Sequence, residues 1–413
     1  MQPRASLAGG PPVRTPSWRL WAAAALLCLV VIAASWPGAL IGDSILQRME
    51  IRAGRITDWH PPLMSIVWRA LGGLPQAMLI LNSIIYWTGI ALLADQLQRQ
   101  AGRRWGLAML AVGLSPISIF YLGRIQKDTL LTALLVLAAG LTARFARGYG
   151  LVPAVIGVLT RINGAFAAAP FFLRTRRLGP AVLASLALAA ALIPASVFVN
   201  RAIFGAERSH VEKTLQLFDL AGTGDPELKR CYSVFEWDTL KYRCQAFDRT
   251  PDDITGRWLG AIAAHPLSYA AHRLSFFNHA IYFLVPPRQE CVLIPDLEDS
   301  CASPGRHPLL VDALARNPFF WPVTWLIAGA LLLFVRPEPL ARMLALSGLL
   351  YGGAYLFVGV AVGFRYFYWT ELAVQIALVW QLAHGLPRWR LILFPVLAAW
   401  IVGYAWRYAP LLF

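Results

Sequence analysis

The chain has 413 residues, of which 58% are hydrophobic and only 14% are charged. A soluble domain is about half apolar and about a quarter charged, so this composition excludes an ordinary soluble enzyme and indicates a membrane protein. The formal net charge of +15 could indicate a nucleic-acid partner. Its distribution, described below, indicates membrane orientation instead, and we expect no nucleic acid as partner.

The first part of the chain predicts a short tail, a helix and a loop. Residues 1–19 are rich in Pro, Gly and Arg and are predicted to be disordered. Leu20–Trp36 resembles the apolar core of a signal peptide, but many apolar runs follow, so we interpret it as an uncleaved first helix. A loop at 37–62 comes next. Within this loop, the pattern of Ser44–Arg55 predicts a short helix at the membrane interface. The segment that follows the loop, residues 63–73, is too short to span the membrane.

Apolar runs close to the ~18 residues that cross a bilayer recur through the rest of the chain. They predict spans at about 74–94, 105–122, 129–146, 178–199, 319–335, 340–362, 366–384 and 391–408. The segment 150–174 is too short for two full helices, and its break at 161–164 predicts two short or tilted helices that meet at or below the outer surface. The expected fold is an all-α polytopic membrane protein with about 11 transmembrane helices and its C-terminus outside.

Basic residues indicate which side faces the cytoplasm. The short segments expected inside are 1–19, 95–104, 144–150, 174–180, 336–342 and 384–390. They hold 15 of the 37 basic residues and only two of the 22 acids, Asp95 and Glu338. This asymmetry follows the positive-inside rule and places the N-terminus in the cytoplasm. Arginine far outnumbers lysine, as in GC-rich bacterial genomes, so we expect a bacterial inner membrane.

The longest loop, at 201–318, is expected outside and is too long for a simple connector. It is predicted to fold as a small cap over the membrane part, and Trp258–Leu284 within it is apolar enough to lie on or dip into the membrane. His265, His272 and His279 would share one face of a helix there. Neighbours would lie about 10 Å apart at ~1.5 Å per residue, too far for one metal ion.

Four of the five cysteines lie in this loop: Cys231, Cys244, Cys291 and Cys301. An even number of cysteines in an oxidising compartment predicts two disulfides. The sequence leaves three pairings open, and local pairing would close the shortest loops. A zinc site is the alternative, although the spacings are wider than usual. Cys28 lies within the first span as a small buried hydrophobe.

Polar residues at the outer ends of separate spans form the candidate site. They are Asp43, Asp58, His60, Arg124, Lys127, Asp128, Arg161, Arg365 and Tyr366. One face of the membrane would thus collect carboxylates that can accept a proton and cations that can hold a phosphate. These groups are needed for a hydroxyl to displace a sugar from a phosphate. Each charge alone could equally be a solvated anchor at the membrane boundary.

Four short segments carry a family resemblance: "DWHPPL", "YLGRIQKDTLL", "LTRINGAFAAAPFFL" and "GFRYFYW". With the acidic residue after the first helix, they resemble landmarks of the GT-C superfamily of integral-membrane glycosyltransferases. The dolichyl-phosphate-mannose mannosyltransferase and aminoarabinose-transferase branch is the most similar. The resemblance covers 20–200 and 319–384. It implies a transmembrane catalytic module at 20–200, a periplasmic subdomain at 201–318 without a matching landmark, and C-terminal transmembrane helices at 319–413.

The resemblance implies that Asp43 is the catalytic base. It would take the proton of an acceptor hydroxyl that attacks C1 of the donor sugar, a single displacement with inversion. Asp43 could instead, or also, cap a helix that starts at Ser44. Asp128 matches the second acidic motif and could orient the acceptor, bind a divalent metal or cap the following helix.

The other candidates are assigned to substrate binding. His60, in the same loop as Asp58, could position the acceptor or the donor phosphate, or "HPP" could be a rigid turn. The cations Arg124, Lys127, Arg161 and Arg365, the last next to Tyr366, are candidates for holding the leaving phosphate. Lys127 could instead be a snorkelling anchor. Glu371 is an intramembrane carboxylate and therefore a functional candidate, without an assigned role.

The side of the membrane indicates the donor. Nucleotide sugars are made in the cytoplasm, whereas a sugar on a polyprenyl phosphate can reach an outward-facing site from the lipid. We therefore expect a sugar to be transferred from a polyprenyl-phosphate donor to an envelope glycan, lipid or protein acceptor. No cofactor is firmly predicted, and a divalent metal stays open.

Two other functional classes are weighed against this expectation. A flippase or transporter of lipid-linked sugars would place its charges near the midplane and show paired halves. An O-antigen polymerase or ligase would rely on large outer loops with several Arg and His residues and would lack the early acidic loop.

Overall fold

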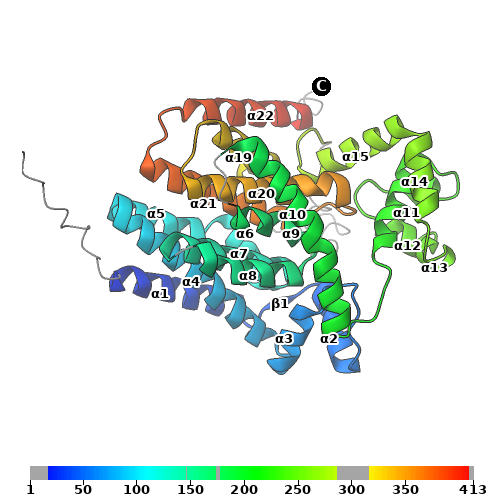
Figure 1. Cartoon of the computed structure of the whole chain (residues 1–413), viewed down its shortest axis with the longest axis horizontal. Helices are drawn as coiled ribbons and strands as arrows, with labels where there is room; N and C mark the ends of the chain where they lie inside the picture. The colour runs from blue at the N-terminus through cyan, green and yellow to red at the C-terminus, as the bar shows by residue number, and fades with distance from the viewer. Residues whose placement is uncertain (1–16, 146, 174–176, 286–315, 409–413) are drawn as a thin grey trace, which may run out of the picture.

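The structure, a computed structural model, describes residues 17–145, 147–173, 177–285 and 316–408. This part of the chain is almost entirely helical (Figure 1). Its one sheet pairs strand β1 (Ala39–Leu40) with β2 (Arg124–Ile125) in parallel. The prediction of an all-α fold is therefore confirmed at the level of class.

The first half of the chain folds into a helical bundle. Its elements are α1 (Trp18–Ser35), α2 (Gly42–Ala53), α3 (Leu63–Ala70), α4 (Pro75–Ala101), α5 (Arg103–Gly113), α6 (Pro116–Leu122), α7 (Lys127–Arg144), α8 (Arg147–Thr160), α9 (Gly164–Ala168), η1 (Ala169–Phe172) and α10 (Leu178–Phe198). α10 continues into a π-helical turn, η2 (Val199–Ile203). The expected short helix in the first loop is present as α2, and the two short helices expected around residues 161–164 are α8 and α9.

Glycines let α4 and α7 pack backbone to backbone. A Cβ on Gly89 would lie 2.6 Å from the carbonyl oxygen of Val136, and one on Gly140 would lie 2.6 Å from that of Gly89. Apolar side chains gain little by leaving lipid for another apolar surface, so close contact between small residues stabilises such crossings. This crossing fixes the start of α7, which carries two of the candidate site residues.

Several helices are long and apolar enough to span a membrane. By length and composition they are α1, α4, α10 with η2, α20 (Pro339–Val358) and α22 (Arg390–Tyr408), and α5 with α6 counts as a sixth if this pair, bent by 48°, is one span. α7 has charged residues at both ends. α19 (Pro322–Phe334) and α21 (Tyr368–His384), with 13 and 17 residues, are shorter than these helices. The number of eleven crossings stays a prediction.

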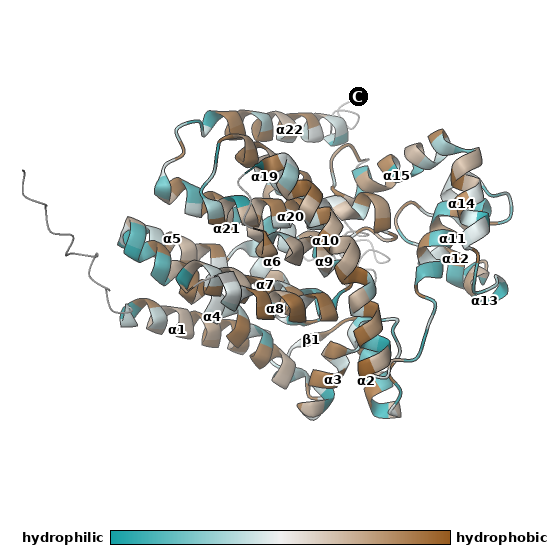
Figure 2. Ribbon diagram, viewed as in Figure 1, coloured by the Kyte–Doolittle hydropathy of each residue, from teal (hydrophilic) through white to brown (hydrophobic). Residues whose placement is uncertain are grey.

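Hydrophobic residues run along the bundle helices, as Figure 2 shows. The apolar stretch of α10 is only 17% buried, although its mean hydropathy is higher than that of the other four candidate spanning helices. An apolar helix with so little protein contact is suited to face lipid.

The segment 201–285 forms a smaller helical unit beside the bundle (Figure 1). It contains α11 (Glu212–Thr223), η3 (Lys229–Cys231), α12 (Asp238–Tyr242), α13 (Ala246–Arg249), α14 (Thr255–Ala264) and α15 (Pro266–Ala280). Leu217, Leu220 and Leu240 belong to a separate apolar core of this unit. Cys231 and Cys244 form a disulfide, which is the local one of the pairings that the sequence left open, and Cys28 is buried as expected. Cys291 and Cys301 lie outside the described residues.

The three spaced histidines do not share one helix face. A break at His265 separates α14 from α15, because Pro266 starts the second helix. His272 alone is buried, where it contacts Asp219 at 3.1 Å and the hydroxyl of Tyr232 at 2.9 Å. This histidine is therefore part of a packed polar core.

A buried arginine joins the 201–285 unit to the bundle. Arg273 pairs with Asp219 at 2.5 Å and donates to the carbonyl oxygen of Gly359 at 2.7 Å, just beyond α20. The chain then continues through η6 (Phe364–Phe367) into α21. The remaining element, η5 (Pro318–Phe320), precedes α19.

Candidate active site

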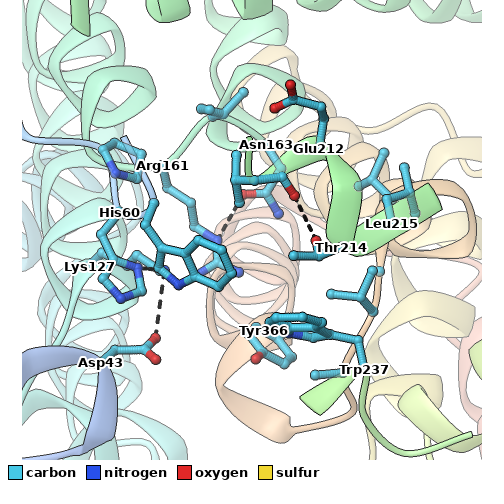
Figure 3. Close-up of a pocket in the computed structure, with 18 of the residues that line it drawn as sticks. Asp43, His60, Lys127, Arg161, Asn163, Glu212, Thr214, Leu215, Trp237 and Tyr366 are labelled. Atoms are coloured by element: carbon cyan, nitrogen blue, oxygen red, sulfur yellow. Dashed lines mark hydrogen bonds and ion pairs between the residues drawn. The ribbon is translucent and has the colours of Figure 1, made fainter. Parts of the chain in front are cut away.

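A cavity of about 870 Å³ lies between the bundle and the 201–285 unit (Figure 3). Seven of the nine predicted site residues line it: Asp43, Asp58, His60, Lys127, Arg161, Arg365 and Tyr366. They come from α2, the loop before α3, the start of α7, the turn between α8 and α9, and η6. The structure thus brings together residues of which the first and the last are more than 300 positions apart in the sequence.

Asp43 lies in the first turn of α2, and it does not cap the helix. The helix begins at Gly42, two residues earlier than the start at Ser44 that a cap by Asp43 would require, and its N-cap is Ile41. The hydroxyl of Ser44 accepts from the backbone N–H of Ile41 at 2.8 Å and donates to its carbonyl oxygen at 2.9 Å. The carboxylate of Asp43 is therefore available to the cavity, and the positive end of the helix dipole favours its charge.

Two cations face this carboxylate. Asp43 Oδ2 lies 3.6 Å from Lys127 Nζ and 3.4 Å from Arg365 Nη1. Burial alone would raise the pKa of Asp43, but the positive charges of Lys127 and then Arg365 hold it well below its ordinary value. Asp43 is therefore ionised at neutral pH, with its side chain 24% exposed toward the cavity.

His60 is neutral and its tautomer is fixed. Its Nδ1 lies 2.7 Å from Lys127 Nζ. Burial, reinforced by the charge of Lys127, lowers the pKa of His60 to about 3. An ammonium group only donates, so Nδ1 accepts and the ring proton resides on Nε2. Within the described residues this Nε2–H is buried without a hydrogen-bond partner, and it remains available as a donor.

Asp128 lies behind the cavity wall and holds Arg161. The two side chains pair at 2.5 Å, and that of Asp128 is only 1% exposed. Arg161 Nε donates to Asn163 Oδ1 at 2.8 Å, and Nη2 donates to the hydroxyl of Tyr355 at 2.5 Å. The guanidinium also lies 5.2 Å from the ring centre of Tyr366. Arg161 therefore presents a fixed positive charge to the cavity.

Arg365 is oriented by the aromatic residue that follows it. Its Nη2 donates to the hydroxyl of Tyr366 at 2.9 Å. The ring of Tyr366 stacks on that of Tyr355 with centroids 5.3 Å apart. The stacked rings of Tyr355 and Tyr366 thus contact both Arg161 and Arg365, although the two arginines are about 200 positions apart in the sequence.

Asp58 lines the cavity, but both of its oxygens are engaged. Oδ2 accepts from Arg201 Nε at 2.6 Å, and Oδ1 accepts from the backbone N–H and the hydroxyl of Ser209 at 2.7 and 2.6 Å. These bonds connect the first loop to the segment that follows η2. They indicate a structural role for Asp58.

Two other candidates lie away from the cavity. Arg124 stacks its guanidinium 3.7 Å from the ring centre of Phe120 and donates to the carbonyl oxygen of that residue at 3.0 Å. Glu371 is fully buried in α21, and both of its oxygens lack a hydrogen-bond partner within the described residues. The structure assigns neither residue to the site.

One wall of the cavity was not expected from the sequence. It carries Trp59 and Trp237 together with the charged residues Glu236, Asp238 and Lys241, and Glu212 also lines the cavity. Trp59 stands between two predicted site residues and could have been found from that position. Trp237 lies in a loop without any landmark, so only the fold brings it to the site.

An apolar surface lines the cavity on the side of α9 and α10. It consists of Ile162, Phe166, Ile193 and Val197. The cavity therefore combines a cationic region with an apolar one, an arrangement suited to an amphiphilic ligand. In the described ranges, no three His, Cys, Asp or Glu side chains cluster as metal ligands do.

Comparison with models of protein families, with curated proteins and with solved structures gives no match for this chain.

Proposed function

We propose that the chain is a membrane glycosyltransferase of the GT-C type that moves a sugar from a polyprenyl phosphate to a hydroxyl acceptor in this cavity. The observation that supports it most is the meeting of Asp43, Lys127 and Arg365 from three separate segments. A carboxylate beside two cations offers both a proton acceptor and a phosphate site. As the sequence led us to expect, the site would face the periplasm of a bacterial inner membrane.

The cationic region suits the phosphate of the donor. Lys127, Arg161 and Arg365 all line it, and Arg161 is held in place by Asp128. The phosphate gains negative charge as its bond to the sugar breaks. Fixed cations in a partly dehydrated cavity stabilise that charge without reorganising, which lowers the barrier.

The apolar surface suits the lipid of the donor. Ile193 and Val197 lie on α10, whose remaining surface is apolar and largely free of protein contacts. A polyprenyl chain lying along α9 and α10 would leave its phosphate next to the cations. A water-soluble nucleotide sugar would gain nothing from this surface.

The reaction is a single displacement. The acceptor oxygen forms a bond to C1 of the sugar while the bond from C1 to the phosphate oxygen breaks, and the electron pair leaves with the lipid phosphate. The acceptor proton passes to the carboxylate of Asp43 and then to solvent. Inversion at C1 follows, because the acceptor attacks from the face opposite the phosphate.

Donor binding would also adjust the base. In the free protein Lys127 and Arg365 pair with Asp43. A bound phosphate would compete for the same two cations and weaken their hold on the carboxylate. The pKa of Asp43 would then rise toward its ordinary value, which makes it a better base when the donor is present. His60 would donate from Nε2 to the phosphate.

The test is a transfer assay on the purified chain in nanodiscs, with radiolabelled polyprenyl-phosphate sugars and envelope fractions as acceptor source. We expect Asp43→Asn to abolish transfer while donor binding persists. Glu227→Gln, at a residue that is 82% exposed and outside the cavity, is the matched control and should transfer normally. A flippase would instead move labelled lipid across a vesicle membrane with little effect of Asp43→Asn, and that result would reject the proposal.

A further inference from the structure

The wall of the cavity opposite Asp43 is built from aromatic rings. In Figure 3, Trp237 lies across the cavity from Lys127 and Asp43. The rings of Trp59 and Trp237 have centroids 5.5 Å apart at an angle of 48°. Phe247 supports both from behind, at 5.5 Å from Trp59 and 5.8 Å from Trp237. Two indole rings therefore form one supported apolar platform at the cavity wall.

The same wall carries negative charge. The residues next to the platform include two carboxylates, Glu236 and Asp238, and one cation, Lys241. The ammonium of Lys241 lies 5.1 Å from the ring centre of Trp59. Around Asp43 cations prevail: Lys127, Arg161 and Arg365 line the cavity there. Asp58, the other lining carboxylate of the first loop, is paired with Arg201. Cations of the cavity therefore gather around Asp43, whereas carboxylates flank Trp237 in the sequence.

Backbone pairing fixes the platform relative to the cations. The N–H of Trp237 donates to the carbonyl oxygen of Val360 at 2.9 Å, and the N–H of Val362 donates to that of Phe235 at 2.7 Å. The strand-like segment 360–362 leads directly into η6, which holds Arg365. Because these bonds join the two walls through the backbone, the distance between platform and cations is set by the fold.

We propose that this wall is the acceptor subsite and that it binds an uncharged saccharide, an inference that rests on the proposed glycosyl transfer. The faces of the indole rings, which carry partial negative charge, would contact the C–H face of a sugar ring. Carboxylates accept hydrogen bonds only, so they suit the hydroxyl groups of that sugar. They would also repel uronic acids and phosphorylated sugars. The anionic phosphate would bind across the cavity, at the cations.

The test measures saccharide binding without turnover. Cellotriose, maltotriose and N,N′,N″-triacetylchitotriose serve as neutral probes, and trigalacturonic acid serves as the anionic probe. Each is titrated onto the full chain in nanodiscs and followed by saturation-transfer NMR. We expect at least one neutral probe to bind, and trigalacturonic acid to bind at least about tenfold more weakly at low salt. Asp238→Asn and added salt should narrow that difference, because both reduce the repulsion.

Variants locate the probe. Trp237→Ala and Trp59→Ala should each weaken binding of the neutral probe by about tenfold, a size expected for one lost aromatic contact. Trp237→Phe keeps an aromatic ring and should bind with intermediate affinity, which covers the case in which Trp237→Ala does not fold. Trp389→Ala removes an exposed tryptophan that does not line the cavity, and it should bind normally. Three results would overturn the proposal. No neutral probe binds, the Trp59 and Trp237 variants bind the neutral probe as tightly as the wild type does, or the wild type prefers the anionic probe.

A second measurement separates this inference from the function on which it rests. Undecaprenyl phosphate should raise the melting temperature of the wild type and of Trp237→Phe, but not that of Arg365→Gln. If the lipid phosphate stabilises the chain while no saccharide depends on the tryptophans, the acceptor subsite is wrong and the transferase proposal stands. If saccharides bind at the tryptophans but the lipid phosphate has no effect, the transferase proposal fails.

Discussion

The ammonium of Lys127 donates to Nδ1 of His60 across 2.7 Å. This bond joins the start of α7 to the loop before α3 and leaves the imidazole neutral. The same ammonium lies 3.6 Å from Asp43, so one lysine links a neutral donor and an ionised carboxylate. A snorkelling anchor would instead extend toward solvent, whereas the side chain of Lys127 is only 14% exposed.

Lys127→Met should lower the rate of transfer by about 10²–10³-fold, the range found when one group that stabilises transition-state charge is removed. The melting-temperature shift caused by undecaprenyl phosphate should shrink in parallel. Lys229→Met, at an exposed lysine in η3, is the control and should behave as wild type. Transfer by Lys127→Met within a few-fold of wild type would contradict a role for this charge.

His60 predicts how stability depends on pH. Its pKa of about 3 in the folded chain lies below the ordinary value of 6.5. The unfolded chain therefore binds the proton first as pH falls, and stability present above pH 6.5 is lost progressively toward pH 3. The slope from this group is at most about 1.4 kcal/mol per pH unit. The free energy of unfolding can be measured with denaturant in micelles at pH 4.5, 5.5, 6.5 and 7.5. It should change less with pH in His60→Gln than in the wild type, and an identical dependence on pH would refute the burial of a neutral imidazole.

Asp58→Asn should lower the free energy of unfolding and leave the affinity for the donor little changed. The change weakens the pairing with Arg201 and the bonds from Ser209. Because Arg201 is 34% exposed, we expect a loss of about 1–3 kcal/mol in the free energy of unfolding, as for a hydrogen bond to a charged group. Glu207→Gln breaks the exposed pair with Arg55 and should change stability little. If Asp58→Asn unfolds like the wild type but loses donor affinity, Asp58 contacts substrate directly.

Gly89→Ala should disrupt the crossing of α4 and α7. The new methyl group would lie 2.6 Å from the backbone of Val136, so the helices must separate. Overpacking of this kind costs about 1–3 kcal/mol. Gly353→Ala, on α20, has open space around the added atom and is the matched control. Equal melting temperatures for the two variants would show that the helices are not packed backbone to backbone.

The sequence predicted the parts of the molecule that depend on local pattern. Apolar runs depend on neighbours in the chain, so most helices of the bundle, the short amphipathic α2 and the break before Gly164 were expected. The single span expected at 105–122 is instead divided into α5 and α6, which are bent by 48°. A disulfide in the long loop was expected, but the sequence did not decide that Cys231 pairs with Cys244. The convergence of seven candidate residues on one cavity was also expected, because all were placed at the same ends of their helices.

The remaining features depend on contacts between distant segments. Whether Asp58 is free or bound depends on Arg201 and Ser209, about 150 residues away. From the sequence, Asp43 was a candidate helix cap. The helix in fact starts one residue before Asp43, and Ser44 and Ile41 form the capping interactions. Trp237 is held at the site by backbone pairing with Val360 and by packing against Trp59 and Phe247. Neither hydropathy nor charge patterning carries information on such partners.

The wide turn η2 at the end of α10 has a consequence for how this chain tolerates insertions and deletions. It places Asn200 and Arg201 at the cavity. Adding or removing one residue in a helix rotates all that follows by about 100° around the axis. A single-residue deletion at 199 or 200 would therefore turn Arg201 away from Asp58 and shift the start of the next segment. Chain length at this junction, which resembles the end of an ordinary span, should be under stricter constraint than the identity of the apolar side chains around it.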